Sequence, residues 1–121
     1  MDGKPLIVAL ESNHSNLELI RQFLEKEGFQ VLGLTSMDEL DTILEEGEAF
    51  DLALLDLTGY NRSIWDRCER LRKGGTPFLI ISPRQSADIQ KESLTHGAKA
   101  ILVKPLAVSE LVGLIRSLLG E

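Results

Sequence analysis

The chain has 121 residues, 43% of them hydrophobic and 26% charged, with a formal net charge of −6 at pH 7. Length and composition predict one globular domain, residues 1–121, and exclude a disordered chain. The acidic balance argues against direct binding to nucleic acid, which needs clustered lysines and arginines. The apolar runs are far shorter than the ~20 residues of a membrane-spanning helix, and no apolar signal segment opens the chain. We therefore expect a soluble, cytoplasmic protein with no membrane contact.

Short apolar runs alternate along the chain with longer segments of helical period. This alternation predicts βα units around a parallel sheet. The first run is continuously apolar, which is typical of a strand that is buried on both faces. The predicted strands cover residues 5–10, 29–34, 51–55, 78–81 and 100–103.

The predicted helices lie between these strands and after the last one. Two of them open on a Ser-x-x-Glu capping box, one at Ser15 and Glu18 and one at Ser36 and Glu39. The single cysteine, Cys68, lies on an apolar helical stripe, so we expect it to pack in the core and form no disulfide. The predicted helices cover residues 15–28, 36–46, 64–73, 87–95 and 109–119.

Polar side chains come at the ends of four predicted strands. They are Glu11, Ser12, Asp56, Ser82 and Lys104. Parallel strands joined by right-handed crossovers all point the same way, so these residues meet at one edge of the sheet. A carboxylate directly after a buried strand is costly unless it is paired. Carboxylates, hydroxyls and a lysine together can bind a hard cation or stabilise the charge of a phosphoryl group.

On these residues the sequence resembles the receiver domain of two-component response regulators, over essentially its whole length. The matching stretches are LIVALES, which contains Glu11, the strand end at Asp56, FLIIS with Ser82, Gly97-Ala98, and ILVKP with Lys104-Pro105. The resemblance implies an α/β fold of the flavodoxin-like, CheY-like kind. Such a fold is a three-layer, doubly wound (βα)5 unit with a parallel sheet of strand order 2-1-3-4-5.

The resemblance also implies a phospho-acceptor switch. Asp56 would be the nucleophile, and the phosphoryl group would come from a histidine kinase, a phosphotransfer protein or a small donor. Lys104 would neutralise phosphoryl oxygens and Ser82 would donate a hydrogen bond to one of them. Such transfer depends on positioning and charge neutralisation, so the chain would be no enzyme beyond self-phosphorylation and self-dephosphorylation.

A magnesium ion belongs to the pattern that the resemblance implies. Its ligands would be Glu11, Asp56, the backbone carbonyl of Thr58 and, weakly, Ser12. The family usually has an acidic residue where this chain has Ser12, and a neutral hydroxyl is a poor ligand for Mg²⁺. We therefore expect weakened Mg²⁺ binding.

The output of the family is read on the face made by the fourth helix, the fifth strand and the fifth helix. The resemblance assigns the switch to Ser82, Ile101 and Pro105. Ile101 stands where the family often has an aromatic ring, so a rotating ring cannot be the readout here. Because the last predicted helix ends close to the C-terminus, we expect a stand-alone receiver that signals through a downstream protein or by homodimerisation on that face.

Three other interpretations remain open. Ser12, Ile101 and the lost proline after the acceptor, where the family commonly has a hydrophobic-Pro pair and this chain has Gly59-Tyr60, favour a pseudo-receiver, which binds a partner without being phosphorylated. Tyr60 and Asn61 either shield an acyl phosphate from water or face the solvent. A dehalogenase-type phosphatase lacks support because Thr58 stands where its second aspartate belongs, and a flavin module would need a phosphate-binding loop after the first strand.

Overall fold

The structure is a computed structural model that describes residues 3–120. Five parallel strands form one sheet in the order β2-β1-β3-β4-β5, and a helix follows each strand. Among residues 3–120, no helix is long and apolar enough to cross a membrane. In chain order the elements are β1 (Leu6–Leu10), α1 (His14–Lys26), β2 (Gln30–Leu34), α2 (Met37–Glu46), β3 (Leu52–Asp56), α3 (Ile64–Lys73), β4 (Phe78–Ser82), α4 (Ala87–Thr95), β5 (Ala100–Val103) and α5 (Val108–Leu118).

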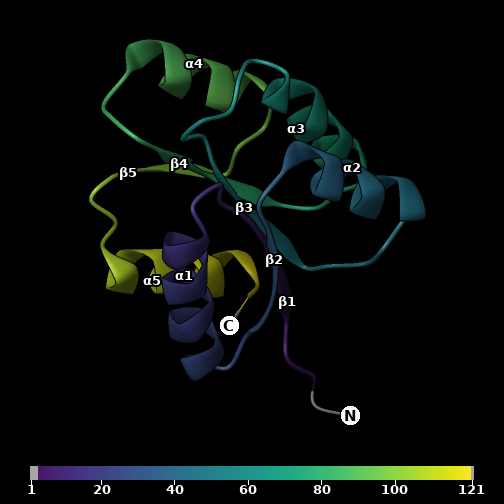
Figure 1. Ribbon diagram of the computed structural model, residues 1–121, viewed down its shortest axis with the longest axis vertical. Coiled ribbons are helices and arrows are strands. Elements are labelled where there is room, and N and C mark those ends of the chain that lie inside the picture. The colour runs from purple at the N-terminus through teal and green to yellow at the C-terminus, as the bar shows by residue number, and fades with distance from the viewer. Residues whose placement is uncertain (1–2, 121) are drawn as a thin grey trace.

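The helices cover the two faces of the sheet. Helices α1 and α5 lie on one face, and α2, α3 and α4 lie on the other (Figure 1). Alternate residues of β1 therefore enter different cores: Ile7 packs with Leu24 and Ile115, whereas Val8 packs on the side of α2 and α3. Burial on both faces explains why the strands are continuously apolar. The predicted fold class and strand order are confirmed.

Several boundaries near the site differ from the predictions, and one of them is the fourth strand, which extends through Ser82. The third strand includes Asp56, which pairs in register with Ile81 of β4, so the carboxylate belongs to the last rung of the sheet. The predicted capping box at Ser15 was wrong, because the side chain of Asn13 caps α1 and accepts from the Asn16 N–H at 2.9 Å. The capping box at residues 36 and 39 is confirmed.

The two helical layers are fixed by close contacts. Gly33 of β2 has no side chain, and a Cβ there would lie 2.9 Å from a methyl group of Leu17, so α1 approaches the sheet closely at this point. On the other face, Arg67 of α3 holds both carboxylate oxygens of Asp41 of α2, at 2.7 and 2.8 Å. Cys68 is completely buried, as predicted, and burial raises the pKa of its thiol to about 12.

Candidate functional site: an acidic pocket at the carboxyl edge of the sheet

Three charged residues meet where the central strands end. Glu11 follows β1, Asp56 ends β3 and Lys104 follows β5. The two acids are buried, with 2% and 1% of their surface exposed. The Lys104 Nζ lies 2.8 Å from Asp56 Oδ2 and 3.7 Å from Glu11 Oε1. These two carboxylate oxygens accept no hydrogen bond of standard geometry from the described residues, and the ammonium is the charge that faces them.

The surroundings of this trio shift the pKa values of Glu11 and Lys104. Burial raises the pKa of the Glu11 carboxyl, and the adjacent Asp56 carboxyl raises it further. Burial by itself would lower the pKa of Lys104, but its contacts with Asp56 and Glu11 outweigh that effect and raise it. One ammonium thus faces two buried carboxyl groups.

Thr58 lies at the centre of this pocket, and contacts reach it from three strand ends. Its N–H donates to Asp56 Oδ1 at 2.8 Å, and Lys104 Nζ donates to its hydroxyl at 3.2 Å. Its backbone carbonyl accepts a hydrogen bond from Ser12 Oγ at 3.1 Å. All four predicted metal-site residues therefore lie together, and Ser12 contacts the Thr58 carbonyl through a donated proton.

Ser82 is buried at the end of β4, but its hydroxyl is engaged within its own loop. It donates to the Arg84 carbonyl at 2.5 Å and lies 3.4 Å from the Arg84 N–H. It borders a small cavity of about 100 Å³ that Ile101 of β5 also lines. Pro105, the remaining predicted switch residue, is exposed and follows a cis peptide bond. The structure brings Ser82 and Ile101 to one cavity and places Pro105 elsewhere.

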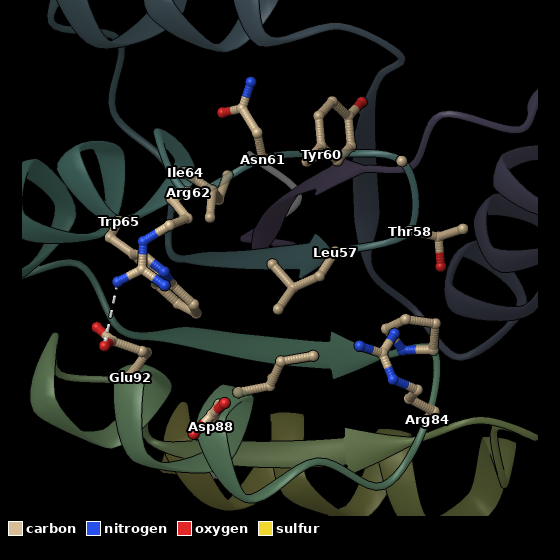
Figure 2. A pocket seen from close by; sticks show the side chains of 13 residues that line it. Leu57, Thr58, Tyr60, Asn61, Arg62, Ile64, Trp65, Arg84, Asp88 and Glu92 are labelled. Carbon is tan, nitrogen blue, oxygen red and sulfur yellow. Dashed lines mark hydrogen bonds and ion pairs between the residues drawn. The ribbon is translucent and has the colours of Figure 1, made fainter.

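A hollow of about 560 Å³ lies on the α3 and α4 side of the pocket. Figure 2 shows Thr58 and Arg84 at one end of it. At the other end, Arg62 pairs with Glu92 of α4 at 3.3 Å, beside the indole of Trp65. Leu57, which follows β3, and apolar side chains of α3 and α4 line the hollow, which lies between the acceptor loop and α4.

A second, more apolar groove of about 310 Å³ opens on the other side, between α1 and the segment that follows β5. Leu19 and Phe23 of α1 line it, with 57% and 47% of their surface exposed. The same groove is also lined by Glu11, Asp56 and Lys104. Sequence reasoning missed it, although the spacing of Leu19 and Phe23 marks a second apolar stripe beside the buried stripe of this helix.

Tyr60 and Asn61, the unusual pair after the acceptor, have different surroundings. Asn61 is exposed and its side chain caps the turn by accepting from the Ser63 N–H at 2.8 Å. Tyr60 is half-buried, and its hydroxyl donates to the Thr35 carbonyl at 2.9 Å. Burial raises the pKa of Tyr60, with Glu11 among the charges that add to the effect. Tyr60 therefore ties the acceptor loop to the segment before α2.

The fold and the pocket define a doubly wound α/β protein whose buried aspartate and lysine suit phosphoryl chemistry. Comparison with known proteins gives the family. The family model described as "Response regulator receiver domain" matches residues 7–116. The chain belongs to this family of two-component signalling domains, as the sequence predicted.

Curated relatives and solved structures agree. The chain is 29% identical over 119 residues to the phosphate regulon transcriptional regulatory protein PhoB of Rhizobium meliloti, covering 95% of this chain and 52% of that protein. It is 30% identical over 117 residues to the transcriptional regulatory protein HprR of Escherichia coli, with the same coverage. The chain thus spans about half the length of these relatives.

Among solved structures, a CheY-like receiver domain protein of Methanospirillum hungatei has a TM-score of 0.87 at 25% identity, covering 98% of this chain and 95% of that one. A response regulator of Thermotoga maritima has a TM-score of 0.85 at 21% identity, covering 98% and 99%. These similarities show that the fold is that of CheY-like receivers.

Proposed function

We propose that residues 1–121 form a single cytoplasmic receiver domain that accepts a phosphoryl group on Asp56. The observation that carries this proposal is the placement of Asp56 Oδ2. This oxygen is buried, lies 2.8 Å from the Lys104 ammonium and belongs to a residue that lines an open groove. A carboxylate held in this way is oriented for attack, and the lysine neutralises charge that develops on the phosphoryl oxygens.

The transfer forms one bond and breaks another. A carboxylate oxygen of Asp56 forms the new P–O bond while the P–N bond of a phosphohistidine breaks, and the imidazole nitrogen retains the electron pair. The Thr58 N–H holds the other carboxylate oxygen in place, at 2.8 Å. Ser82 contributes only after its hydroxyl leaves the Arg84 carbonyl, so phosphorylation and rearrangement of this loop are coupled.

The apolar groove favours a protein donor, namely a histidine kinase or a phosphotransfer protein. Leu19 and Phe23 are exposed on α1, and exposed apolar patches mark contact sites. Because the same groove reaches Asp56 and Lys104, a helix that packs there brings its phosphohistidine to the acceptor.

Receiver domains generally bind Mg²⁺ at an acidic pocket of this kind. In this chain, Glu11, Asp56 and the Thr58 carbonyl are the oxygens that would hold it. Ser12 adds no charge, so we expect the affinity for Mg²⁺ to be lower than in relatives with an acid at that position.

Output is proposed on the face of α4, β5 and α5. Release of the Ser82 hydroxyl would change the small cavity that it shares with Ile101, and thereby the packing between α4 and β5. Pro105, exposed after β5, does not line this cavity and instead lines the groove beside α1. A downstream protein binds this face, or a second copy of the chain does.

Intact-protein mass spectrometry after incubation with acetyl phosphate tests the acceptor. We expect a single phosphoryl adduct on the wild type and none on Asp56→Asn, which keeps the shape of the side chain and removes the nucleophile. An adduct that persists in Asp56→Asn, or no adduct on the wild type with or without Mg²⁺, contradicts the proposal.

The donor groove has a matched control in Leu94, an exposed leucine of α4 that is 56% exposed and lies outside the groove. We expect Leu19→Ala to slow transfer from a phosphorylated histidine phosphotransfer protein by about tenfold, and Leu94→Ala to leave it unchanged. Both variants should accept a phosphoryl group from acetyl phosphate at the wild-type rate. If Leu19→Ala slowed phosphoryl transfer from the phosphotransfer protein and from acetyl phosphate equally, Leu19 would not be a docking residue.

The pseudo-receiver stays the second candidate because the Ser82 hydroxyl is bonded to Arg84 and not to the acceptor. In that case the pocket would hold one conformation for a protein partner. Absence of any adduct on the folded wild type would favour this function.

A further inference from the structure

The oxygens at the edge of the sheet do not fit a tightly bound cation. Mg²⁺ requires near-octahedral coordination and is usually held by carboxylates together with water. Position 12 carries a neutral hydroxyl, so Glu11 and Asp56 are the carboxylates of this pocket. Within the described part of the chain, no group of three or more Asp, Glu, His or Cys side chains is arranged to hold a metal ion.

The Thr58 carbonyl, which would be the third oxygen of such a site, already accepts a hydrogen bond from Ser12 Oγ at 3.1 Å. The adjacent Gly59 has a φ of +81°, a backbone conformation that favours glycine, and its Cα faces the Ser12 side chain. The β1–α1 loop is therefore joined to the acceptor loop at the point where a cation would bind.

The other polar groups of Thr58 have partners as well. Its N–H is bonded to Asp56 and its hydroxyl to Lys104. The segments at the ends of β1, β3 and β5 thus meet at one threonine.

A serine and an aspartate at position 12 have opposite effects on this loop. The serine hydroxyl is a donor, so it attracts the Thr58 carbonyl directly. An ionised aspartate is only an acceptor, so it repels that carbonyl until a cation lies between them.

We infer that Ser12 is a positioning residue that replaces the divalent cation in ordering the acceptor loop, so that Asp56 is oriented without Mg²⁺. This inference goes beyond the proposed function and beyond weak metal binding, because it assigns the hydroxyl a task of its own. It rests on the contacts of Thr58 and holds whether or not Asp56 is phosphorylated.

Calorimetric titration with MgCl₂ provides the first test, on the wild type, Ser12→Asp, Ser12→Thr and Ser12→Ala. Ser12→Asp restores a charged ligand, so it should bind Mg²⁺ at least about tenfold more tightly than the wild type. Ser12→Thr and Ser12→Ala should bind no better than the wild type. Wild-type affinity equal to that of Ser12→Asp would overturn the inference.

Amide hydrogen exchange in the presence of EDTA provides a second test that does not depend on metal binding. The Thr58 and Tyr60 amides should be protected in the wild type and in Ser12→Thr, which keeps the hydroxyl. They should exchange about fivefold faster in Ser12→Ala. In Ser12→Asp they should become protected only when Mg²⁺ is added.

Unchanged exchange in Ser12→Ala would also overturn the inference, and this comparison remains decisive if Ser12→Asp fails to fold. The two proposals fail separately. If the wild type forms no phosphoryl adduct but its Thr58 and Tyr60 amides stay protected in EDTA, the proposed function is wrong and this inference stands. If the wild type is phosphorylated but its Thr58 and Tyr60 amides are protected only with Mg²⁺, this inference is wrong and the proposed function stands.

Discussion

Tyr60 shows at the residue scale how this chain holds its acceptor loop. Its hydroxyl donates to the Thr35 carbonyl at 2.9 Å, so the loop after Asp56 is attached to the segment before α2. A phenylalanine at this position would keep the packing of the ring but could not donate the hydrogen bond to the Thr35 carbonyl. The loop is therefore fixed on one side by Ser12 and on the other by Tyr60.

Tyr60→Phe should lower the free energy of unfolding by about 1 kcal/mol, because one half-buried hydrogen bond is lost and the Thr35 carbonyl remains. Urea denaturation followed by circular dichroism measures this. Tyr60→Leu, which also removes the ring, should cost more. Equal stability of Tyr60→Phe and the wild type would mean that the bond contributes nothing.

The same residue predicts an alkaline pH dependence. Folding raises the pKa of Tyr60 above its ordinary value of 10.0, so the protonated phenol favours the folded state. The stabilisation of the folded protein by the protonated phenol is complete below pH 10.0 and is lost as the pH rises through the pKa of Tyr60 in the folded state. Tyr60 is the one tyrosine of the chain, so phenolate absorbance reports it alone. The midpoint in native protein should lie above that in urea.

Residue patterns located the charged groups of the pocket but not all of their contacts. Glu11, Asp56 and Lys104 were found because strand ends fix their positions independently of side-chain detail. The bonds of Ser82 and Tyr60 depend on the paths of loops, which periodicity does not determine. Asn13 was missed as the cap of α1 because Ser15 presents an equally suitable local pattern.

At the scale of elements, the pair Arg67–Asp41 joins α3 to α2. Both guanidinium contacts are short, and the two side chains are 21% and 25% exposed. The bond from Arg67 holds the pKa of Asp41 below its ordinary value. Charge-assisted, bidentate pairs of this kind stabilise more than ordinary surface pairs do.

Asp41→Asn should lower the free energy of unfolding by about 1–2 kcal/mol at neutral pH. Glu45→Gln, an exposed acid of the same helix, is the matched control and should change it little. Because the Asp41 pKa is lowered, its stabilisation is present above the ordinary value of 3.8 and is lost as the pH falls through the folded-state pKa. Urea denaturation should therefore show a difference in stability between the wild type and Asp41→Asn at neutral pH, and this difference should disappear at strongly acidic pH. A constant difference would contradict this.

The central strands β1, β3 and β4 were predictable because their continuously apolar runs are buried. The helices were predictable from apolar residues at helical spacing. The third strand extends one residue beyond its predicted end, because the charged side chain of Asp56 does not interrupt the backbone ladder. Backbone pairing with β4 continues through Asp56, since the ladder needs only the main chain. The order of the strands came from the resemblance to receivers, because periodicity identifies elements and not their neighbours.

At the scale of the whole molecule, the pocket opposes stability. Glu11 and Asp56 are buried together and share one ammonium, and burial and the neighbouring acid raise the pKa of Glu11. The folded state must therefore hold a charge that water would solvate better.

Glu11→Gln should raise the free energy of unfolding at neutral pH by about 1 kcal/mol, a usual gain when a strained functional site is relieved. Glu18→Gln, on the exposed side of α1, should have little effect. Thermal and urea unfolding measure both variants. A loss of stability in Glu11→Gln would mean that the contacts of this carboxylate with Lys104 and Asn13 outweigh its burial.

Gly33 lies on the edge strand β2, but the close approach of α1 that it allows also affects the groove beside Asp56 at the centre of the sheet. Leu17 and Arg21 rest on this glycine from the inner side of α1, and Leu19 and Phe23 face outward on the same helix. Because α1 also lines the groove beside Asp56, the distance between α1 and β2 influences the width of that groove. A side chain at position 33 would push α1 outward and change the groove that we propose for the donor, although Gly33 does not line it.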